Sequence, residues 1–321
     1  MLSLDGDSTW TIVPTTPSYD TINLIDNTDL AVGSGATNNA DVNGDTGDNA
    51  MTISGTQAGD VALAGGDDAV LFDLDAGGNF TGTVLDGGAH STGDSIGFTG
   101  TGTYTIDSAP LTAATNFEGL AVSGGGNFTV QDTLDAGITQ IDILEDNTEL
   151  VLTGGNAYTA DVMGDGDHQE LTVDNATVNG DIDLGAGGDV LTLDLDDGAI
   201  NPTSPTGGIS GGADIDTLAL NDTDGSGEVI DLDEYVLFEQ LDLAGDGVIT
   251  IDDTSDLDPV GANNTSFATV NLADDTDLVI SDDSTLTAFI NGGTLGTDVE
   301  VEGVLAGDID LDAGDDSFII D

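Results

Sequence analysis

The stretch Asp189-Val190-Leu191-Thr192-Leu193-Asp194-Leu195 decides the fold class. Apolar and polar residues alternate along it at a period of two, which predicts a β-strand with one buried face. Gly185-Ala186-Gly187-Gly188 precedes the stretch and Asp197-Gly198 follows it, so turn-forming residues bound the strand. Similar strings recur along the chain, and no convincing amphipathic helix interrupts them. The sequence therefore predicts an all-β protein.

The chain is a tandem repeat with a unit of about 120 residues. The block 24–30 (LIDNTDL) returns in similar form as 144–150 and 272–278, and the offsets between such blocks differ by whole short loops. The array begins and ends in mid-unit, which is typical of a slice of a longer protein or of a subunit whose ends meet neighbours. Its parts are a partial repeat 1–18, repeat units 19–138 and 139–266, and a partial repeat 267–321.

Two architectures suit such a repeat. In a parallel β-solenoid, coils of about 20 residues stack about 4.8 Å apart, which predicts about sixteen coils in the chain. In tandem β-sandwiches, each unit forms one immunoglobulin-like domain. We favour the solenoid, because the repeat offsets vary in this way and aromatic residues make up only 4% of the chain. No linker rich in Pro and Ser separates the units, as separate domains would require.

Acidic side chains dominate the charge. The chain has 63 acids, of which 54 are Asp, and no Lys or Arg, giving a formal net charge of −63. Internal ion pairs cannot compensate this charge, so either bound divalent cations or high ambient salt must screen the self-repulsion. The excess of Asp over Glu favours divalent cations, because the short Asp side chain fixes a carboxylate close to the backbone.

The same composition excludes several classes of partner. Without basic residues nothing neutralises a phosphate, so nucleic acid and anionic membranes are excluded as direct electrostatic partners. No apolar run approaches the length of about 18 residues that a membrane-spanning helix needs, so we expect no membrane insertion. The first residues carry no secretory leader, which fits a C-terminal or partner-supplied export signal, or a trimmed start. Short β-branched strings such as 278–280 argue against a disordered chain.

The stretch 222–233 carries the best local motif. Oxygen-bearing side chains fall at its positions 1, 3 and 5, glycine at 6, an aliphatic residue at 8 and an acid at 12. It closely resembles an EF-hand calcium loop, although its last acid is Asp where that family has Glu, and predicted strands flank it. An acidic, solvated turn is the alternative. The resemblance implies calcium bound by Asp222, Asp224, Ser226 and the Glu228 carbonyl, with Asp233 closing the site.

A weaker motif, 41–48, opens in a way that resembles a dockerin-type calcium loop. Its glycine is displaced by one position from that pattern. The resemblance implies metal binding by Asp41, Asn43 and Asp45, and by Asp165 and Asp167 at the matching place in the next unit.

The Gly-Asp turns form a third group. Residues 185–191 fit the Gly-x-Gly-x-Asp-x-apolar core of the RTX repeats of type I-secreted proteins, and 65–70 and 313–318 fit it in part. The turns 87–96 and 211–218 are of the same kind, and plain β-turns are the alternative. With the solenoid expectation, the chain resembles extracellular β-solenoids of the RTX or autotransporter kind. The resemblance implies calcium held between turns by Asp67, Asp68, Asp189, Asp315 and Asp316.

Signals for catalysis are sparse. His90 and His168 lie far apart in the sequence at different repeat phases and no third His exists, so a His-rich metal site is unsupported. Pairs of Asp are expected by chance among 63 acids. A β-helix polysaccharide lyase or epimerase is the enzyme alternative, but such enzymes bind acidic sugars and this chain has no Lys or Arg to neutralise them. We therefore expect no enzyme.

These observations lead us to expect a calcium-stabilised structural protein located outside the cell or at its surface. It is expected to form a fibre, a surface layer or an adhesin stalk by self-assembly, with cell-surface glycan as a further partner. A calcium-mediated module that binds glycan or mineral is the alternative. Adaptation to high salt competes as the origin of the acidity.

Overall fold

The computed structural model shows parallel sheets stacked as a β-solenoid of about 14 turns, with almost no helix. The chain divides into two compact units, Met1–Met163 (unit 1) and Gly164–Asp321 (unit 2). The described residues are 1–6, 8–15, 18–89, 93–106, 109–135, 137–203, 208–222, 224–230, 232, 235–245, 247–252, 265–282 and 284–321.

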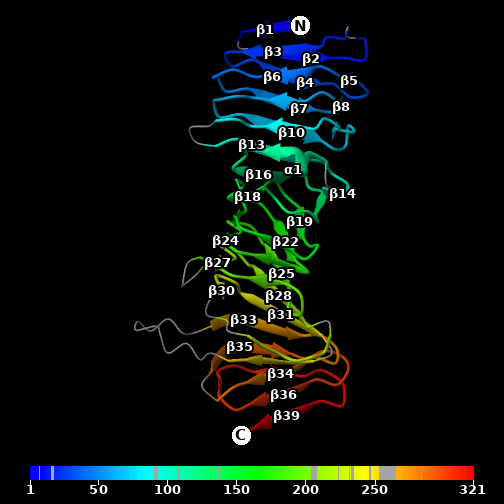
Figure 1. Ribbon diagram of the computed structural model, residues 1–321. Coiled ribbons are helices and arrows are strands. Elements are labelled where there is room, and N and C mark those ends of the chain that lie inside the picture. Colours follow the sequence, from blue (N-terminus) through cyan, green and yellow to red (C-terminus); the bar gives the residue numbers. More distant parts are fainter. Residues whose placement is uncertain are drawn as a thin grey trace. The chain divides into compact units, whose positions relative to one another are not determined.

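In unit 1, successive coils pass through the same sheets in turn and lie one above the next (Figure 1). One sheet contains β1 (Leu2–Asp5), β3 (Thr21–Ile25), β6 (Asp41–Asn43), β9 (Val61–Ala62), β12 (Leu85–Asp86) and β15 (Ala114–Thr115). A second contains β2 (Thr9–Ile12), β4 (Asp29–Val32), β7 (Ala50–Ile53), β10 (Ala69–Asp73), β13 (Ser95–Thr99), β16 (Gly119–Ser123), β18 (Gln140–Ile143) and β21 (Asp161–Met163). The remaining elements are β5 (Thr37–Asn38), β8 (Thr56–Gln57) and β11 (Asn79–Phe80), then β14 (Thr103–Ile106), β17 (Asn127–Val130) and β19 (Thr148–Leu152), with β20 (Asn156–Tyr158) and helix α1 (Ala109–Ala113).

Unit 2 follows the same plan. Its longest sheet contains β22 (Gln169–Val173), β25 (Val190–Asp194), β28 (Thr217–Asp222), β31 (Gln240–Gly245), β33 (Thr265–Leu272) and β35 (Thr285–Asn291), and β35 pairs with both β37 (Val304–Leu305) and β38 (Ile309–Asp310). A second contains β29 (Glu228–Ile230), β32 (Val248–Ile251), β34 (Asp277–Ile280), β36 (Asp298–Val301) and β39 (Ser317–Ile320). The short strands are β24 (Ile182–Asp183), β27 (Ile209–Ser210) and β30 (Tyr235–Val236), and β23 (Ala176–Val178) with β26 (Ala199–Ile200).

Strand pairing confirms the solenoid. Among the described residues of each unit, neighbouring strands run parallel, as β10 does with β7 and β13. A parallel neighbour must come from a different coil, because a tight hairpin can join only antiparallel strands. An immunoglobulin-like sandwich is built from antiparallel sheets, so the pairing is that of the solenoid and not that of the sandwich.

Coil length varies more than the sequence predicted. Asn49 and Asp68, which are hydrogen-bonded across neighbouring coils, lie 19 residues apart in the sequence. Asn271 and Asp242, which are bonded in the same way, lie 29 residues apart. The expectation of about sixteen coils is therefore wrong: loops of different length between strands lengthen the average coil, and about 14 turns result.

Alternating side chains build the core of each unit. In unit 1, Leu30 pairs with Met51 and Met51 with Val70, and all three are buried. Phe72 and Phe98 stack with ring centroids 5.3 Å apart and planes 15° apart. Each fully buried aliphatic or aromatic side chain of this kind contributes roughly 1.5–3 kcal/mol. The predicted strand at 189–195 shows the same alternation, with Leu191 and Leu193 buried in β25.

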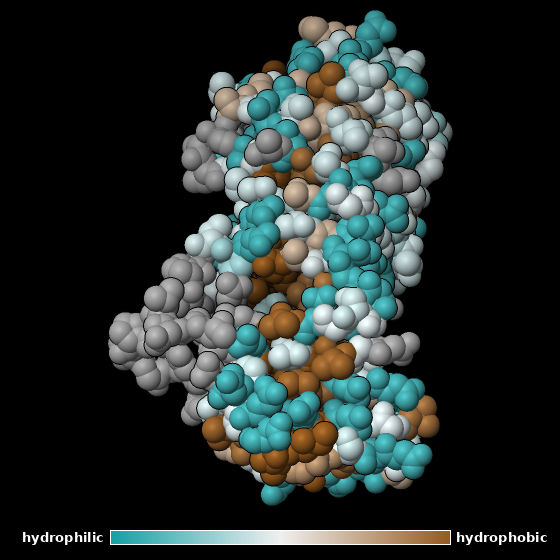
Figure 2. All heavy atoms as spheres, turned by 60° about the horizontal axis from the view of Figure 1, so that its bottom comes forward, coloured by the Kyte–Doolittle hydropathy of each residue, from teal (hydrophilic) through white to brown (hydrophobic). Residues whose placement is uncertain are grey.

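Not every apolar side chain is covered. Figure 2 shows apolar residues at its lower end, where the bottom of Figure 1 comes forward. Phe318 and Ile320 of the last strand, β39, are exposed. Within the described part of the chain, no helix is long and apolar enough to cross a membrane.

Candidate metal centre

Three acidic side chains of unit 2 come together where β28 ends. Asp222 is the last residue of β28, Asp224 comes soon after it, and Asp196 belongs to the preceding coil. One carboxylate oxygen of each lies within 4.8 Å of the other two. Two oxygens that bind one calcium ion lie at most about 5 Å apart, since each Ca–O distance is about 2.3–2.6 Å. The three carboxylates can therefore share one ion.

Backbone hydrogen bonds shape the loop around its first carboxylate. The side chain of Asp222 is fully buried, and its Oδ1 and Oδ2 accept the N–H groups of Gly225 and Gly227 at 2.8 and 3.1 Å. Asp224 Oδ1 accepts the N–H of Ser226 at 2.7 Å. Aspartate-led turns of this type fix both carboxylates before any ion binds.

The coils on either side complete the site. Asp196 Oδ2 accepts the backbone N–H of Asp224 at 2.7 Å, which ties the preceding coil to the loop. Gly247, in the following coil, leaves room for Asp222, because a Cβ atom there would lie 1.9 Å from Asp222 Oδ2. A carboxylate oxygen that accepts one hydrogen bond keeps a lone pair for a cation. Since the chain has no Lys or Arg, a cation from solution is the available neutralising partner.

The structure brings together two of the residues that the EF-hand-like motif predicts as calcium ligands. Asp222 and Asp224 share the site, whereas Ser226 Oγ donates to Glu228 Oε1 at 3.1 Å. Glu228 begins strand β29. Asp233, the predicted closing ligand, lies outside the described residues.

Asp196 was not predicted from the sequence, because it lies in another coil, 28 residues before Asp224. Its counterpart one repeat earlier, in unit 1, is Asp75, whose Oδ2 accepts the backbone N–H and hydroxyl of Thr101 at 3.0 and 2.9 Å. Thr101 in unit 1 thus plays the part that Asp224 plays in unit 2. The repeat therefore gives no signal that Asp196 is a metal ligand, because its counterpart Asp75 faces a threonine and not an acid.

One more acidic triplet appears in the described part of the chain. Glu300, Glu302 and Asp321 each place one oxygen within 4.8 Å of the others. All three side chains are partly or fully exposed, so water and salt screen their mutual repulsion. Unlike Asp222, none of them is buried.

The Gly-Asp turns of unit 2 place their aspartates at a buried corner. The backbone N–H of Gln169 donates to Asp189 Oδ1 at 2.7 Å, and that of Asp189 donates to Asp216 Oδ1 at 2.8 Å. The N–H of Asp216 donates in turn to Glu239 Oε2 at 3.0 Å. Asp189 and Asp216 are fully buried. We call these four residues the acid ladder of unit 2.

Unit 1 contains the same ladder, one repeat earlier. Asn49 donates its N–H to Asp68 Oδ1 at 2.6 Å, Asp68 donates to Asp94 Oδ1 at 2.7 Å, and Asp94 donates to Glu118 Oε2 at 2.8 Å. The turns of Asp94 and Asp216 are visible in the sequence, but these two aspartates were not predicted as site residues.

Burial sets the ionisation of these acids. It raises the pKa of Asp189 to about 6 and the pKa of Asp68 to about 7, while hydrogen bonds from Gln169 and Asn49 act in the opposite direction. Burial also raises the pKa of Asp216. A buried carboxylate loses its hydration, so the neutral acid is favoured.

The remaining Gly-Asp candidates lie at or near the surface. The backbone N–H of Asp67 donates to Asp48 Oδ1 at 2.9 Å, and Asp315 is exposed. Asp316 Oδ1 accepts the N–H of Thr297 at 3.0 Å, which repeats the ladder contact a third time. Calcium at the Gly-Asp turns stays a prediction, and the contacts that the structure gives Asp68, Asp189 and Asp316 are those of hydrogen-bond acceptors.

The dockerin-like residues of unit 1 turn toward different coils. Asp41 Oδ1 accepts the N–H of Asp60 in the following coil at 3.1 Å, whereas Asp45 Oδ2 accepts the N–H of Asp26 in the preceding coil at 3.0 Å. Asn43 Nδ2 donates to the side chain of Asn23 at 3.3 Å. These contacts link neighbouring coils and do not gather the three side chains around one point.

At the matching place in unit 2, Asp165 Oδ1 accepts the N–H of Asp167 at 3.0 Å and the side-chain N–H of Gln169 at 2.6 Å. His168 comes next to them in the chain, with Nε2 3.3 Å from Glu170 Oε1. His90 lies outside the described residues.

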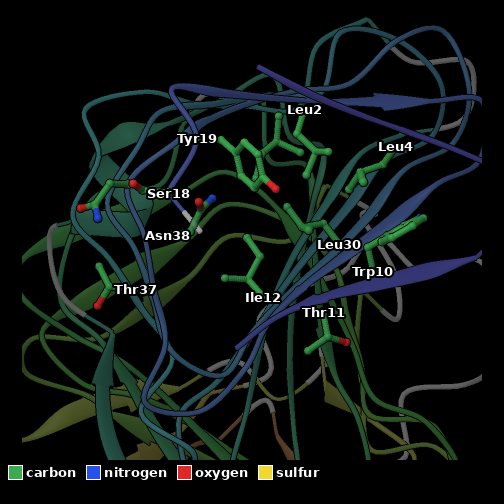
Figure 3. Close-up of a pocket in the computed structure, with 12 residues that line it drawn as sticks. Leu2, Leu4, Trp10, Thr11, Ile12, Ser18, Tyr19, Leu30, Thr37 and Asn38 are labelled. Carbon is green, nitrogen blue, oxygen red and sulfur yellow. The ribbon is translucent and has the colours of Figure 1, made fainter. Parts of the chain in front are cut away.

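A cavity of about 420 Å³ opens at the first coils of unit 1 (Figure 3). Leu4, Ile12, Trp10, Tyr19 and Leu30 are among the side chains that line it. The same inward positions are filled by aliphatic side chains in later coils. The described residues of the lining include no acidic or basic side chain, so the cavity offers apolar surface and no charged group for chemistry.

Comparison with protein-family models, with curated proteins and with solved structures finds no match to this chain. The function is therefore argued from the site and the fold alone.

Proposed function

We propose that this chain is a structural protein of the cell surface or extracellular space, whose solenoid is stabilised by calcium bound between Asp196, Asp222 and Asp224. The observation that carries the proposal is the approach of three carboxylate oxygens to within 4.8 Å of one another in a chain without Lys or Arg. Like charges at this distance repel strongly unless a cation lies between them. The ion is assigned to this site alone.

The ligand chemistry favours calcium over other divalent ions. The site offers only oxygen atoms, and neither Cys nor a nearby His supplies the softer ligands that zinc prefers. Calcium accepts six to eight oxygens in flexible geometry, and waters fill the places that the protein leaves open. Because Asp224 is exposed, water reaches the ion from that side.

Binding at this site stabilises the fold by linkage. An ion held by Asp196 and by the loop after β28 joins two successive coils, and these contacts are lost on unfolding. At a free calcium concentration of about one hundred times Kd, the folded state gains about 2.7 kcal/mol.

Self-assembly into a fibre, layer or stalk is part of the proposal. Copies that each carry a net charge of −63 repel one another, and divalent cations screen or bridge that charge. Surface glycan, bound through calcium, is the further partner of an adhesive role. Electron microscopy of the full chain with calcium should show filaments or layers, and dispersed single particles under all calcium conditions would contradict the assembly.

Thermal unfolding of the full chain tests the calcium site. Calcium should raise the Tm and EDTA should lower it, while NaCl at matched ionic strength should not replace calcium. Asp224→Asn, at an exposed position, should remove most of the calcium response and one ion from the stoichiometry measured by calorimetry. The matched control is Asp75→Asn, at the counterpart of Asp196 in unit 1. This variant should keep the calcium response of the Tm and the number of bound ions. Equal Tm values in calcium and EDTA would refute the site, and rescue by NaCl alone would indicate adaptation to salt.

A further inference from the structure

The acid ladder contains buried oxygen atoms that lack a partner. In unit 2, Oδ1 of both Asp189 and Asp216 accepts a backbone hydrogen bond, but Oδ2 of each is buried and has no hydrogen-bond partner. The two side chains are fully buried. A buried polar atom without a partner costs about 1–3 kcal/mol, and an ionised one costs more.

Asn49 shows that a neutral side chain with a donor and an acceptor can occupy a position of the ladder. It precedes Asp68 in the ladder of unit 1, and its Nδ2 donates to the carbonyl oxygens of Asp26 and Thr28 at 2.8 and 3.1 Å. A carboxylate has only acceptors, whereas a carboxylic acid has one O–H donor. A neutral aspartic acid therefore resembles Asn in hydrogen bonding, with a donor and an acceptor on the same short side chain.

The charges around the ladder oppose ionisation. Asp189 faces Asp165 and His168 on the side of the preceding coil and Asp216 on the side of the following coil. Asp216 faces Asp214 and Glu239. His168 is the single group of these that can carry positive charge, and the acids outnumber it.

Unit 1 repeats this environment. Asp68 Oδ2 is buried without a hydrogen-bond partner, and the side chain is 1% exposed. It faces Asp48, Asp67 and Asp94, all acids. The same arrangement in two repeats indicates a feature of the fold and not an accident of one coil.

We propose that Asp189 and Asp216 in unit 2, and Asp68 in unit 1, are held as neutral carboxylic acids in the folded protein at mildly acidic pH, so that the solenoid takes up protons on folding there and loses stability as the pH rises toward neutrality. The direction of the pH effect follows from the linkage between proton binding and folding. An acid that is neutral in the folded state and ionised in the unfolded state makes the folded state bind more protons, so the free energy of unfolding falls as the pH rises. The burial that raises the pKa values of Asp189 and Asp68 supports this direction. This proton uptake is separate from the calcium site, which contains none of these three aspartates.

Urea unfolding of the full chain across pH, in EDTA at constant ionic strength, tests the proposal. For each neutral acid, the unfolding equilibrium constant rises up to about tenfold per pH unit between its unfolded and folded pKa values. The double variant Asp189→Asn/Asp216→Asn keeps a donor and an acceptor at each position without a charge. It should be more stable than the wild type at about pH 8 and should show a flatter pH dependence.

The control is Asp308→Asn, which removes a charge from an exposed position of the same unit outside the ladder. It should keep the pH slope of the wild type. A double variant that is less stable than the wild type at about pH 8, or that keeps the full slope, overturns the proposal. If calcium restores the wild type and not the double variant at that pH, the ladder binds cations and the neutral-acid assignment is wrong.

Infrared spectroscopy gives a second readout that needs no stability comparison. The folded wild type at about pH 5 should show the carbonyl stretch of buried carboxylic acids, and the band should shrink in Asp189→Asn/Asp216→Asn. Absence of a band that depends on these two residues contradicts the proposal, even if the pH slope changes.

Discussion

Asp60 binds Thr83 of the following coil through both donors that Thr83 offers: the backbone N–H and the hydroxyl donate to Asp60 Oδ1 at 2.7 and 3.0 Å. The N–H of Val84 donates to the same oxygen at 3.0 Å. A short carboxylate on one coil thereby caps the backbone of the next, a role that suits Asp because its carboxylate lies close to its own backbone. The same contact to a threonine recurs at Asp75–Thr101, Asp181–Thr203 and Asp274–Thr294.

Variants of Asp60 and Thr83 test whether these hydrogen bonds hold the two coils together. Asp60→Ala removes the acceptor of three donors and should lower the urea midpoint of unfolding. Asp60→Asn keeps an oxygen acceptor and should lose less. Thr83→Val, which removes the hydroxyl alone, should fall between the wild type and Asp60→Ala. Equal losses for the alanine and asparagine variants would show that charge, and not hydrogen bonding, holds the coils together.

The hydrogen bonds that Asp60 and Asp274 accept from the following coil also predict how the free energy of unfolding changes at low pH. The backbone hydrogen bond from Thr83 holds the pKa of Asp60 below its ordinary value of 3.8, and that from Leu295 does the same for Asp274. A lowered folded pKa contributes stability that is present above about pH 4 and is lost as the pH falls through the folded pKa. The difference in unfolding free energy between the wild type and Asp60→Asn should therefore shrink below about pH 4. A difference that stays constant to about pH 2 would contradict the prediction.

The alternation of residues 189–195 was enough to predict strand β25, and the repeat of such strings favoured the parallel solenoid that the structure shows. Both signals are local or periodic, so they survive changes in coil length. The partner of Asp222 could not be predicted in this way. Asp196 lies one coil earlier, and the number of residues in a coil is not constant, so no fixed spacing points to it.

The ladder was missed for a different reason. The turns of Asp68 and Asp189 are interpreted as metal ligands in the sequence because they resemble RTX repeats, and nothing in the sequence shows that these two side chains are fully buried. Which side of the corner each aspartate faces depends on the turn conformation, and Asp67 and Asp68 differ by one position. The structure buries Asp68 and leaves Asp67 half-exposed.

Phe98 tests the packing of unit 1. It is 2% exposed and stacks on the fully buried Phe72. Phe98→Ala leaves a cavity that neighbouring coils cannot fill, and it should cost about 3–5 kcal/mol of unfolding free energy, measured by urea titration. Phe289→Ala is the control, since Phe289 is 39% exposed, and it should cost clearly less. Similar losses at the two positions would mean that the inner face of the solenoid is loosely packed.

Gly212 tests the close approach of neighbouring coils at the ladder turn. Its φ is +109°, and a Cβ atom there would lie 1.9 Å from the carbonyl oxygen of Gly185 in the preceding coil. Gly212→Ala must both strain the backbone and push the coils apart, so it should cost at least about 1–3 kcal/mol. Gly166→Ala is the matched control in the same unit, because a Cβ atom there meets nothing within 4 Å. It should be neutral or gain about 0.4–1 kcal/mol from the stiffer unfolded chain. If the two variants unfold at the same urea concentration, the turn does not hold the coils in the register described.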